Sequence, residues 1–181
     1  MTMTQTKSGG YYARLAGTLL LISVIVAGLL GLVNHITADK ISAINAEKTA
    51  ESMRQVLPAD SYNEIAYTGS DAAVAKLYEA PGAGYVVEVT PAGFGGTIDM
   101  VVGVGTDGAV TGVAIVSMSE TSGLGANASK ESFRSQFVGL SGELAVSKDG
   151  GQIDALTGAT ITSRAVTSGV NSALAAVAEL G

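Results

Sequence analysis

Residues 97–116 read TIDMVVGVGTDGAVTGVAIV, and the pattern of this stretch sets the architecture of the folded domain. Two runs rich in β-branched residues, 97–104 and 109–116, flank the tetrapeptide Gly105-Thr106-Asp107-Gly108. An Asp-Gly pair between alternating apolar residues is a strong hairpin signal, because both residues tolerate a positive φ. The stretch therefore predicts two antiparallel strands joined by a short turn.

The segments before this hairpin continue the pattern. Residues 85–89 (YVVEV) predict a further strand, and the Pro81-Gly82-Ala83-Gly84 sequence ahead of them indicates a loop. We expect a short helix over residues 70–78. The sheet is thus expected to be at least partly antiparallel.

The segments after the hairpin change period again. Residues 129–137 predict a helix with Phe133 and Phe137 one turn apart, and residues 143–146 predict a strand. Residues 160–163 (TITS) are expected to open a last helix over 164–180, whose apolar stripe consists of Val166, Val170, Leu174 and Val177. Strands in the middle and helices on either side indicate an α+β domain over residues 59–181.

The N-terminal part of the chain is apolar. Residues 15–33 are 19 consecutive uncharged residues, and at 1.5 Å per residue they would span roughly 28 Å, close to the hydrocarbon thickness of a bilayer. We expect a tail at 1–14, a transmembrane helix at 15–37 and a helical stalk at 38–58, which ends at Pro58. A cleaved signal peptide is the alternative, although its apolar region is usually shorter.

Charge and composition narrow the classes of function. Residues 34–181 contain 8 Lys and Arg against 16 Asp and Glu without a basic patch, which argues against nucleic acid as a partner. The absence of cysteine excludes thiolate metal sites and Cys-bound iron–sulfur clusters. The single histidine, His35, lies at the expected membrane boundary, so neither a Ser-His-Asp triad nor a multi-histidine metal site is expected. The basic residues flanking the apolar segment leave its orientation open.

Glycine motifs give no nucleotide site of the usual kinds. The chain contains no Gly-Lys-Ser/Thr sequence, which excludes a P-loop. Gly103, Gly105 and Gly108 match the spacing of a dinucleotide-binding motif, but that motif requires a helix after it, and here a strand is expected. We interpret these glycines as part of the hairpin.

The hydroxyl-rich sequence Thr157-Gly158-Ala159-Thr160-Ile161-Thr162-Ser163 precedes and opens the last helix. Free backbone N–H groups and the positive end of the helix dipole converge at such a position and favour an anion. The alternative is that one of the hydroxyls caps the helix, as Ser and Thr commonly do.

The sequence from Asp154 to Thr160 (DALTGAT) resembles the flavinylation signature of the G subunit of the Rnf ion-translocating electron-transport complex. It is similar to that of the C subunit of the sodium-translocating NADH:quinone reductase. The resemblance implies that a separate flavin transferase, using FAD, joins the hydroxyl of Thr160 to the phosphate of FMN. Thr160 would then be an attachment point, and no catalytic side chain and no metal site are expected.

Two upstream motifs extend the resemblance over nearly the whole chain. They are Gly93-Phe94-Gly95-Gly96 before a strand and Glu120-Thr121-Ser122-Gly123-Leu124-Gly125 after the hairpin. The family usually has Pro at the position of Ser122, and often a His shortly before the Glu, so these details depart from its pattern. The residues expected to contact FMN, besides Thr160, are Thr157, Gly158, Ala159, Thr162, Asp154, Glu120, Thr121, Gly123, Leu124, Gly125 and Gly95.

The resemblance implies an electron-transfer flavoprotein subunit with one covalent FMN per chain. Its expected place is the cytoplasmic or inner membrane, with the flavin domain on the extracytoplasmic side. Its expected partners are the other membrane and peripheral subunits of a ferredoxin:NAD oxidoreductase complex that transports sodium ions or protons. Two alternatives remain open. One is the equivalent flavin subunit of a sodium-translocating NADH:quinone reductase, and the other, of a different class, is a membrane-anchored sensor module that binds an anion reversibly without covalent flavin.

Overall fold

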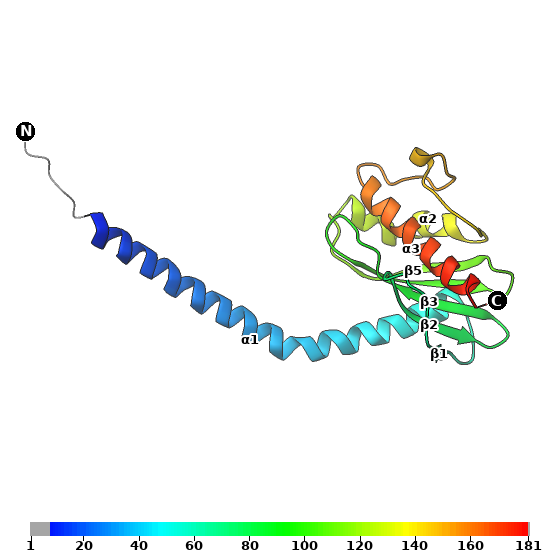
Figure 1. The fold of residues 1–181 in the computed structure, drawn as a ribbon, viewed down its shortest axis with the longest axis horizontal. Coiled ribbons are helices and arrows are strands. Elements are labelled where there is room, and N and C mark those ends of the chain that lie inside the picture. Colours follow the sequence, from blue (N-terminus) through cyan, green and yellow to red (C-terminus); the bar gives the residue numbers. More distant parts are fainter. Residues whose placement is uncertain (1–7, 181) are drawn as a thin grey trace, which may run out of the picture. The chain divides into compact units, whose positions relative to one another are not determined.

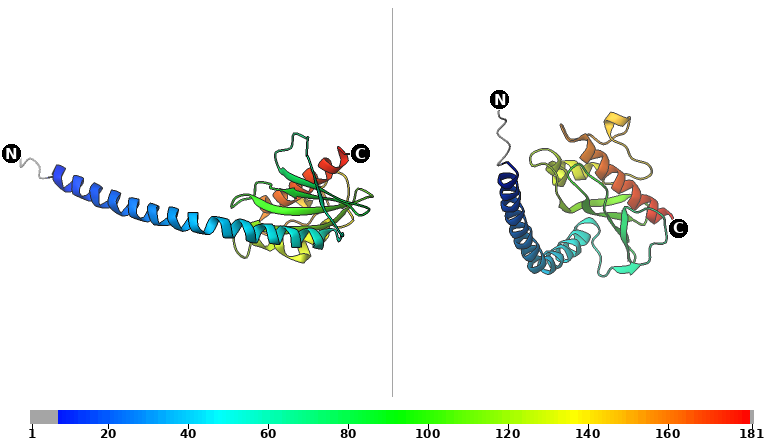
Figure 2. Two further views of the ribbon diagram at one scale, coloured as in Figure 1. Left: turned by 90° about the horizontal axis from the view of Figure 1, so that it is seen from below. Right: turned by 60° about the vertical axis from the view of Figure 1, so that its left-hand side comes forward.

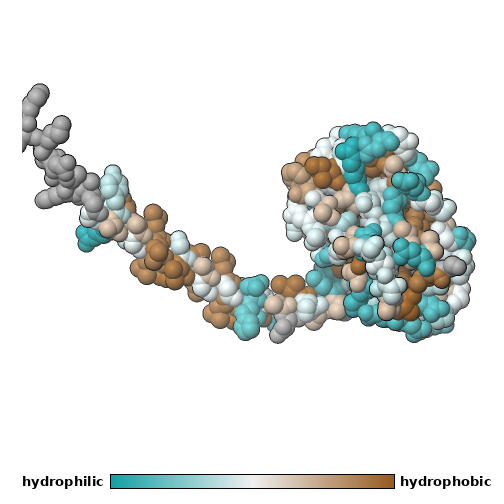
Figure 3. Space-filling view, in the orientation of Figure 1, coloured by the Kyte–Doolittle hydropathy of each residue, from teal (hydrophilic) through white to brown (hydrophobic). Residues whose placement is uncertain are grey.

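The computed structural model describes residues 8–180, and the first element, helix α1 (Ser8–Val56), is a single uninterrupted helix (Figure 1). Its segment Gly10–Ala38 contains an 18-residue stretch with a mean hydropathy of 2.5 and no buried residue, so the segment is long and apolar enough to cross a membrane. Figure 3 shows this segment as a largely apolar surface. The expected spanning segment at 15–37 lies within it, and residues 1–7 of the expected tail lie outside the described residues.

The chain forms two compact units, Met1–Ile44 and Asn45–Gly181, so the last turns of α1 belong to the globular unit. The centre of this unit is a five-stranded sheet in which each strand pairs antiparallel with the next along the chain. The strands are β1 (Asn63–Ile65), β2 (Val74–Ala80), β3 (Gly84–Val89), β4 (Ile98–Gly105) and β5 (Val110–Met118). The α+β class and the three strands expected over 85–116 are confirmed.

The predicted hairpin joins β4 to β5. The amide of Gly105 donates to the carbonyl of Ala109 at 2.8 Å, and Gly108 has a φ of 75°, as the turn requires. A strand therefore follows these glycines, and no helix does. The hairpin interpretation of the glycine spacing is confirmed.

Two helices pack on opposite faces of the sheet (Figure 2). Helix α3 (Thr160–Ala178) covers one face, where Val166 and Val170 are fully buried against strand residues such as Leu77. The predicted stripe is confirmed in that Leu174 is also buried, whereas Val177 is only partly buried. On the other face, the end of α1 packs Met53 and Val56 against the sheet, together with Leu57 directly after the helix.

The end of α1 lies directly on two glycines of the sheet. Gly103 and Gly112 are paired across β4 and β5. A Cβ atom on Gly103 would lie 2.7 Å from the carbonyl oxygen of Val56, and one on Gly112 would lie 2.9 Å from its Cα. The hydroxyl of Thr111 donates to the same carbonyl at 2.6 Å. The lack of a side chain at Gly103 therefore allows the end of α1 to pack closely on the sheet.

The helix expected over residues 70–78 is wrong, because this segment contains most of strand β2. Val74, Leu77 and Ala80 are buried at intervals of three, which imitates a helical period. The real cause is that β2 is buried on both faces: Leu77 packs under α3 and Ala80 on the α1 side. An irregularity in the register between Val74 and Lys76 keeps Val74 on the same side as Leu77.

Two further expectations are corrected. The strand expected at 143–146 does not form, because both backbone groups of Leu144 bond to the side chain of Asn171 at 2.8 and 3.0 Å, and only Val146 makes an isolated bridge, to Ile153. The helix expected at 129–137 is broken into shorter turns, although Phe133 and Phe137 do stack edge to face. The turns in this half of the chain are η1 (Gly125–Ser129), α2 (Glu131–Arg134), η2 (Ser135–Phe137) and η3 (Ser147–Asp149).

Candidate functional site

The N-terminus of α3 has no side-chain cap. Its N-cap residue is Ala159, whose side chain has no hydrogen-bonding group, and no side chain bonds to the cap position. A tight turn precedes it, in which the amide of Ala159 donates to the carbonyl of Leu156 at 3.0 Å and Gly158 has a φ of 76°. The alternative that a hydroxyl merely caps this helix is therefore wrong, and the positive end of the helix is left for another acceptor.

The hydroxyls of the first turn have separate tasks. The Oγ of Ser163 accepts from the amide of Leu156 and donates to the carbonyl of Ala159, both at 2.9 Å, which fixes the turn before the helix. The Oγ1 of Thr162, almost fully buried, donates to Oε2 of Glu120 at 2.8 Å. The Oγ1 of Thr160, which is half-buried, accepts from Nζ of Lys148 at 2.9 Å.

Glu120 joins three segments that are far apart in the sequence. Its Oε1 accepts from the amides of Phe94 and Gly95 at 2.8 and 3.1 Å, while Oε2 accepts from Thr162. Charge-assisted bonds of this type are stronger than bonds between neutral groups. One carboxylate therefore holds the 93–96 loop against the start of α3.

Glycines allow these segments to approach closely. A Cβ on Gly95 would lie 2.1 Å from the carbonyl oxygen of Ser119, and a Cβ on Gly93 would lie 2.2 Å from Oε1 of Glu120. A Cβ on Gly125 would lie 2.6 Å from Oε2 of Glu120 and 2.7 Å from Oγ1 of Thr162. The two upstream glycine motifs therefore act together, through Glu120.

A cavity of about 410 Å³ opens at this junction. Its lining combines a hydroxyl, a cation and large exposed apolar side chains: Phe94, Leu124 and Ile161 are 68%, 43% and 52% exposed. Cavities of a few hundred Å³ with an apolar lining and a few converging polar groups are typical of cofactor sites. The full lining is Phe94, Glu120, Thr121, Leu124, Gly125, Lys148, Gly158, Ala159, Thr160, Ile161 and Thr162.

Lys148 reaches the cavity from η3. The next residue, Asp149, accepts two hydrogen bonds from Arg164 of α3, at 2.6 and 2.5 Å. Hydrogen bonds from Arg164 lower the pKa of the Asp149 carboxyl, and the same bonds raise the pKa of Arg164. Because Arg164 lies one turn after Thr160, this pair fixes η3 beside the start of the helix.

The structure brings together most of the residues expected from the sequence. Eight of them line the cavity, namely Glu120, Thr121, Leu124, Gly125, Gly158, Ala159, Thr160 and Thr162. Four expected residues do not: Gly95 bonds to Glu120, the carbonyl of Gly123 accepts from Asn127, the amide of Asp154 donates to Gln136, and Thr157 is exposed. That any of these residues contacts a cofactor stays a prediction.

Sequence reasoning missed Phe94, Lys148 and Ile161, which also line the cavity. Phe94 and Ile161 stood inside quoted motifs, and two large apolar residues in polar, Gly- and Thr-rich sequence were a usable signal. Lys148 had no comparable signal, because its 12-residue separation from Thr160 is closed only by the fold.

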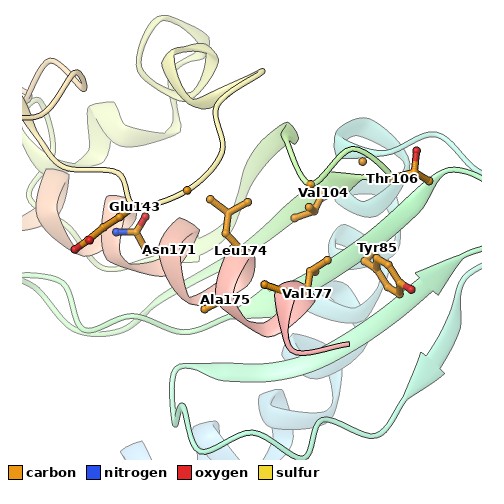
Figure 4. Close-up of a pocket in the computed structure, with 12 residues that line it drawn as sticks. Tyr85, Val104, Thr106, Glu143, Asn171, Leu174, Ala175 and Val177 are labelled. Carbon is orange, nitrogen blue, oxygen red and sulfur yellow. The ribbon is translucent and has the colours of Figure 1, made fainter. Parts of the chain in front are cut away.

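A second cavity, of about 550 Å³, lies at the other end of α3 (Figure 4). Leu174 and Val177 of the helix and Tyr85 and Val104 of the sheet face it. Among the residues that the structure describes, its only charged lining residue is Glu143, and no Lys or Arg lines it. The cavity at Thr160 also contains a carboxylate, Glu120, but its lining includes Lys148, so it is the better candidate for a ligand that carries a phosphate.

Comparison with known proteins identifies the family. The FMN-binding domain family matches residues 93–175, from the loop at Phe94 to the last turns of α3. The G subunit of the ion-translocating oxidoreductase complex of Methanosarcina acetivorans is 35% identical over 170 residues, covering 87% of this chain and 89% of that protein. The chain belongs to this G-subunit family.

Other relatives carry more specific names. The G subunit of the Na(+)-translocating ferredoxin:NAD(+) oxidoreductase complex of Acetobacterium woodii is 35% identical, covering 84% of this chain and 85% of that protein. The G subunit of the proton-translocating ferredoxin:NAD(+) oxidoreductase complex of Clostridium ljungdahlii is 38% identical, covering 86% of each. The expected resemblance to Rnf G subunits is confirmed, and the chain is a redox subunit with an FMN-binding domain that works with other subunits. Together with the apolar segment of α1, this membership makes it a membrane-associated protein.

Proposed function

We propose that this protein relays electrons through one FMN, joined by a phosphoester to the hydroxyl of Thr160. The complex it serves transfers electrons between ferredoxin and NAD and couples that transfer to transport of sodium ions or protons. One observation carries the proposal: at the uncapped start of α3, the hydroxyl of Thr160 faces a cavity and meets a cation, whereas Thr162 and Ser163 are bonded within the protein.

The polar end of the cavity fits a phosphate. The positive end of the α3 dipole stabilises an anion by roughly 0.3–1 kcal/mol at an exposed site, and the ammonium of Lys148 lies at the same point. A phosphodiester on Thr160 would carry one negative charge where both groups favour it. The chain offers this combination at Thr160, which supports the proposed attachment there.

The apolar end of the cavity fits an aromatic ring system. Leu124 lies beside the turn before α3, since a Cβ on Gly158 would lie 3.1 Å from its Cδ2. Phe94 and Ile161, each more than half exposed, line the same cavity. FMN supplies one- and two-electron redox chemistry when bound, while the protein supplies position and surroundings. The role of Phe94, Leu124 and Ile161 is to cover the ring and exclude water from it.

The attachment is a phosphoryl transfer with FAD as the second reactant. The Oγ1 of Thr160 forms a bond to the phosphorus of the FMN half of FAD. The bond between that phosphorus and the bridging oxygen of the pyrophosphate breaks, and AMP leaves. The proton of the hydroxyl passes to a base of the flavin transferase, so the chain gains FMN less one water.

A covalent link suits a flavin domain on the extracytoplasmic side of the membrane, where we place it. A flavin held only by contacts dissociates when its free concentration falls below the dissociation constant, and free flavin is scarce outside the cytoplasm. Protease added to intact cells, or to spheroplasts where an outer membrane is present, tests the side. We expect digestion of residues 40–181, and protection of that segment would contradict this placement.

Production of the full chain together with a flavin transferase tests the attachment. After denaturation, the wild-type band should fluoresce under ultraviolet light and carry the added mass, and Thr160→Ala should show neither. Ser168→Ala is the matched control, because Ser168 is an exposed hydroxyl of the same helix outside both the Asp154–Thr160 motif and the cavity lining, and it should remain labelled. An unlabelled wild-type chain would favour reversible anion binding at the same cavity instead.

A further inference from the structure

Lys148 is held at a position that would be unfavourable for a cation unless an anion joined it. Its Nζ donates to a neutral oxygen, Oγ1 of Thr160, at 2.9 Å. Over residues 8–180, no carboxylate lies within ion-pair distance of Lys148. The start of α3 is itself positive, and a cation near a helix N-terminus is destabilised. Two positive groups thus converge on one hydroxyl.

The neighbouring carboxylate does not neutralise them. Glu120 lines the same cavity, but both its oxygens are already engaged, by the amides of Phe94 and Gly95 and by the buried hydroxyl of Thr162. Asp149, next to Lys148 in the sequence, is turned to Arg164. The charge of Lys148 is therefore left for a group that comes to Thr160.

The backbone that carries Lys148 is firmly fixed. The amide of Ser147 donates to the carbonyl of Ile153 at 2.7 Å, and that of Gly151 donates to the carbonyl of Val146 at 3.0 Å. The bidentate pair of Asp149 and Arg164 adds a connection from η3 to α3. A long, exposed Lys side chain loses rotamer freedom when it is held in one place, so this arrangement indicates a specific partner.

We propose that Lys148 is the counter-ion of the phosphate on Thr160 and that the Asp149–Arg164 pair positions it. The inference rests on the proposed attachment of FMN to Thr160. Lys148 pairs with a non-bridging phosphate oxygen in the finished phosphodiester. During the transfer from FAD it stabilises the negative charge on the phosphoryl group as the Thr160 oxygen bonds to phosphorus and AMP leaves.

The test uses the full chain in detergent with a flavin transferase and FAD, and follows the added mass over time. Lys148→Gln should label roughly tenfold more slowly than wild type, as loss of one charge-assisted hydrogen bond predicts. Lys148→Glu should be slower still, and Lys148→Arg should recover much of the rate because it keeps the charge. Lys130→Gln is the matched control, since it removes an exposed Lys outside the cavity lining.

A second readout reports on the finished product. The ³¹P chemical shift of the phosphodiester should move in fully labelled Lys148→Gln and Arg164→Gln, and stay unchanged in Lys130→Gln. A rate and a ³¹P shift in Lys148→Gln equal to those of wild type would overturn the role of Lys148 while leaving the attachment intact. An unlabelled wild-type chain would instead overturn the attachment, and with it this inference.

Discussion

The carboxylate of Glu120 accepts a hydrogen bond from the hydroxyl of Thr162 at 2.8 Å, across 42 residues of sequence. Thr162 is 1% exposed and lies in the first turn of α3. The other oxygen of Glu120 holds the amides of Phe94 and Gly95. Three motifs that are separate in the sequence therefore meet at one side chain beside Thr160.

Glu120→Ala should destabilise the domain and release the 93–96 loop. The substitution leaves the buried hydroxyl of Thr162 without its acceptor, which costs about 1–3 kcal/mol. It also frees the amides of Phe94 and Gly95, which are exposed and can bond to water instead. We expect a lower melting temperature and faster hydrogen exchange at the amides of Phe94 and Gly95. Glu143→Ala removes an exposed carboxylate and should change neither. Unchanged exchange at both amides in Glu120→Ala would contradict the role of Glu120.

Leu124→Ala and Phe94→Ala should expose the flavin ring without preventing its attachment. Both side chains line the cavity but make no hydrogen bond to Thr160, so the added mass should match that of wild type. Quenching of flavin fluorescence by iodide should increase in the native protein. Quenching equal to that of wild type in both variants would contradict the role of Phe94 and Leu124 in covering the ring. Val138→Ala, an exposed apolar residue outside the cavity lining, is the control.

Gly103→Ala should loosen the end of α1 from the sheet. The added Cβ would lie 2.4 Å from Oγ1 of Thr111 and 2.7 Å from the carbonyl oxygen of Val56. Overpacking of this kind costs typically 1–3 kcal/mol, so the melting temperature should fall and hydrogen exchange near Val56 should rise. Thr106→Ala, exposed in the same hairpin, should have little effect. If the wild-type chain bound NAD and Gly103→Ala did not, that result would favour the interpretation of these glycines as a dinucleotide-binding motif.

Asp149 should titrate below the usual pKa of an Asp, about 3.9, because Arg164 stabilises its charged form. A lowered pKa in the folded state means that Asp149 stabilises the fold above its unfolded pKa. That contribution is lost as pH falls through the lower, folded pKa. Carboxyl ¹³C titration of wild type and Arg164→Gln tests this: the pKa should rise toward about 3.9 in the variant, and equal values would contradict the pairing.

The sequence was most informative where one period dominates. The β4–β5 hairpin follows from β-branched runs around an Asp-Gly turn, and α3 follows from its apolar stripe, so local patterns sufficed for both. Strand β2 was mistaken for a helix because it is buried on both faces and has an irregular register, which gives a spacing of three. Periodicity alone does not distinguish a helix from a strand that is buried on both faces.

The site was predictable in part for a related reason. The motifs at Glu120 and Thr160 are local in sequence, so both were found, but the bonds that join them span 42 residues and depend on the finished fold. Likewise, the contact between Lys148 and Thr160 depends on a turn fixed by Asp149 and Arg164, which no sequence period encodes. The strand expected at 143–146 is absent because the side chain of Asn171 bonds to both backbone groups of Leu144. A periodic pattern in the sequence does not reveal such a contact.

The most direct measurement of the central claim is fragmentation mass spectrometry of one tryptic peptide. Trypsin cuts after Lys148 and Arg164, so residues 149–164 form a peptide with four hydroxyl side chains, Thr157, Thr160, Thr162 and Ser163. In the chain produced with a flavin transferase, we predict FMN less one water on Thr160. Flavin mapped to Thr157, Thr162 or Ser163, or retained by Thr160→Ala on this peptide, would contradict the account.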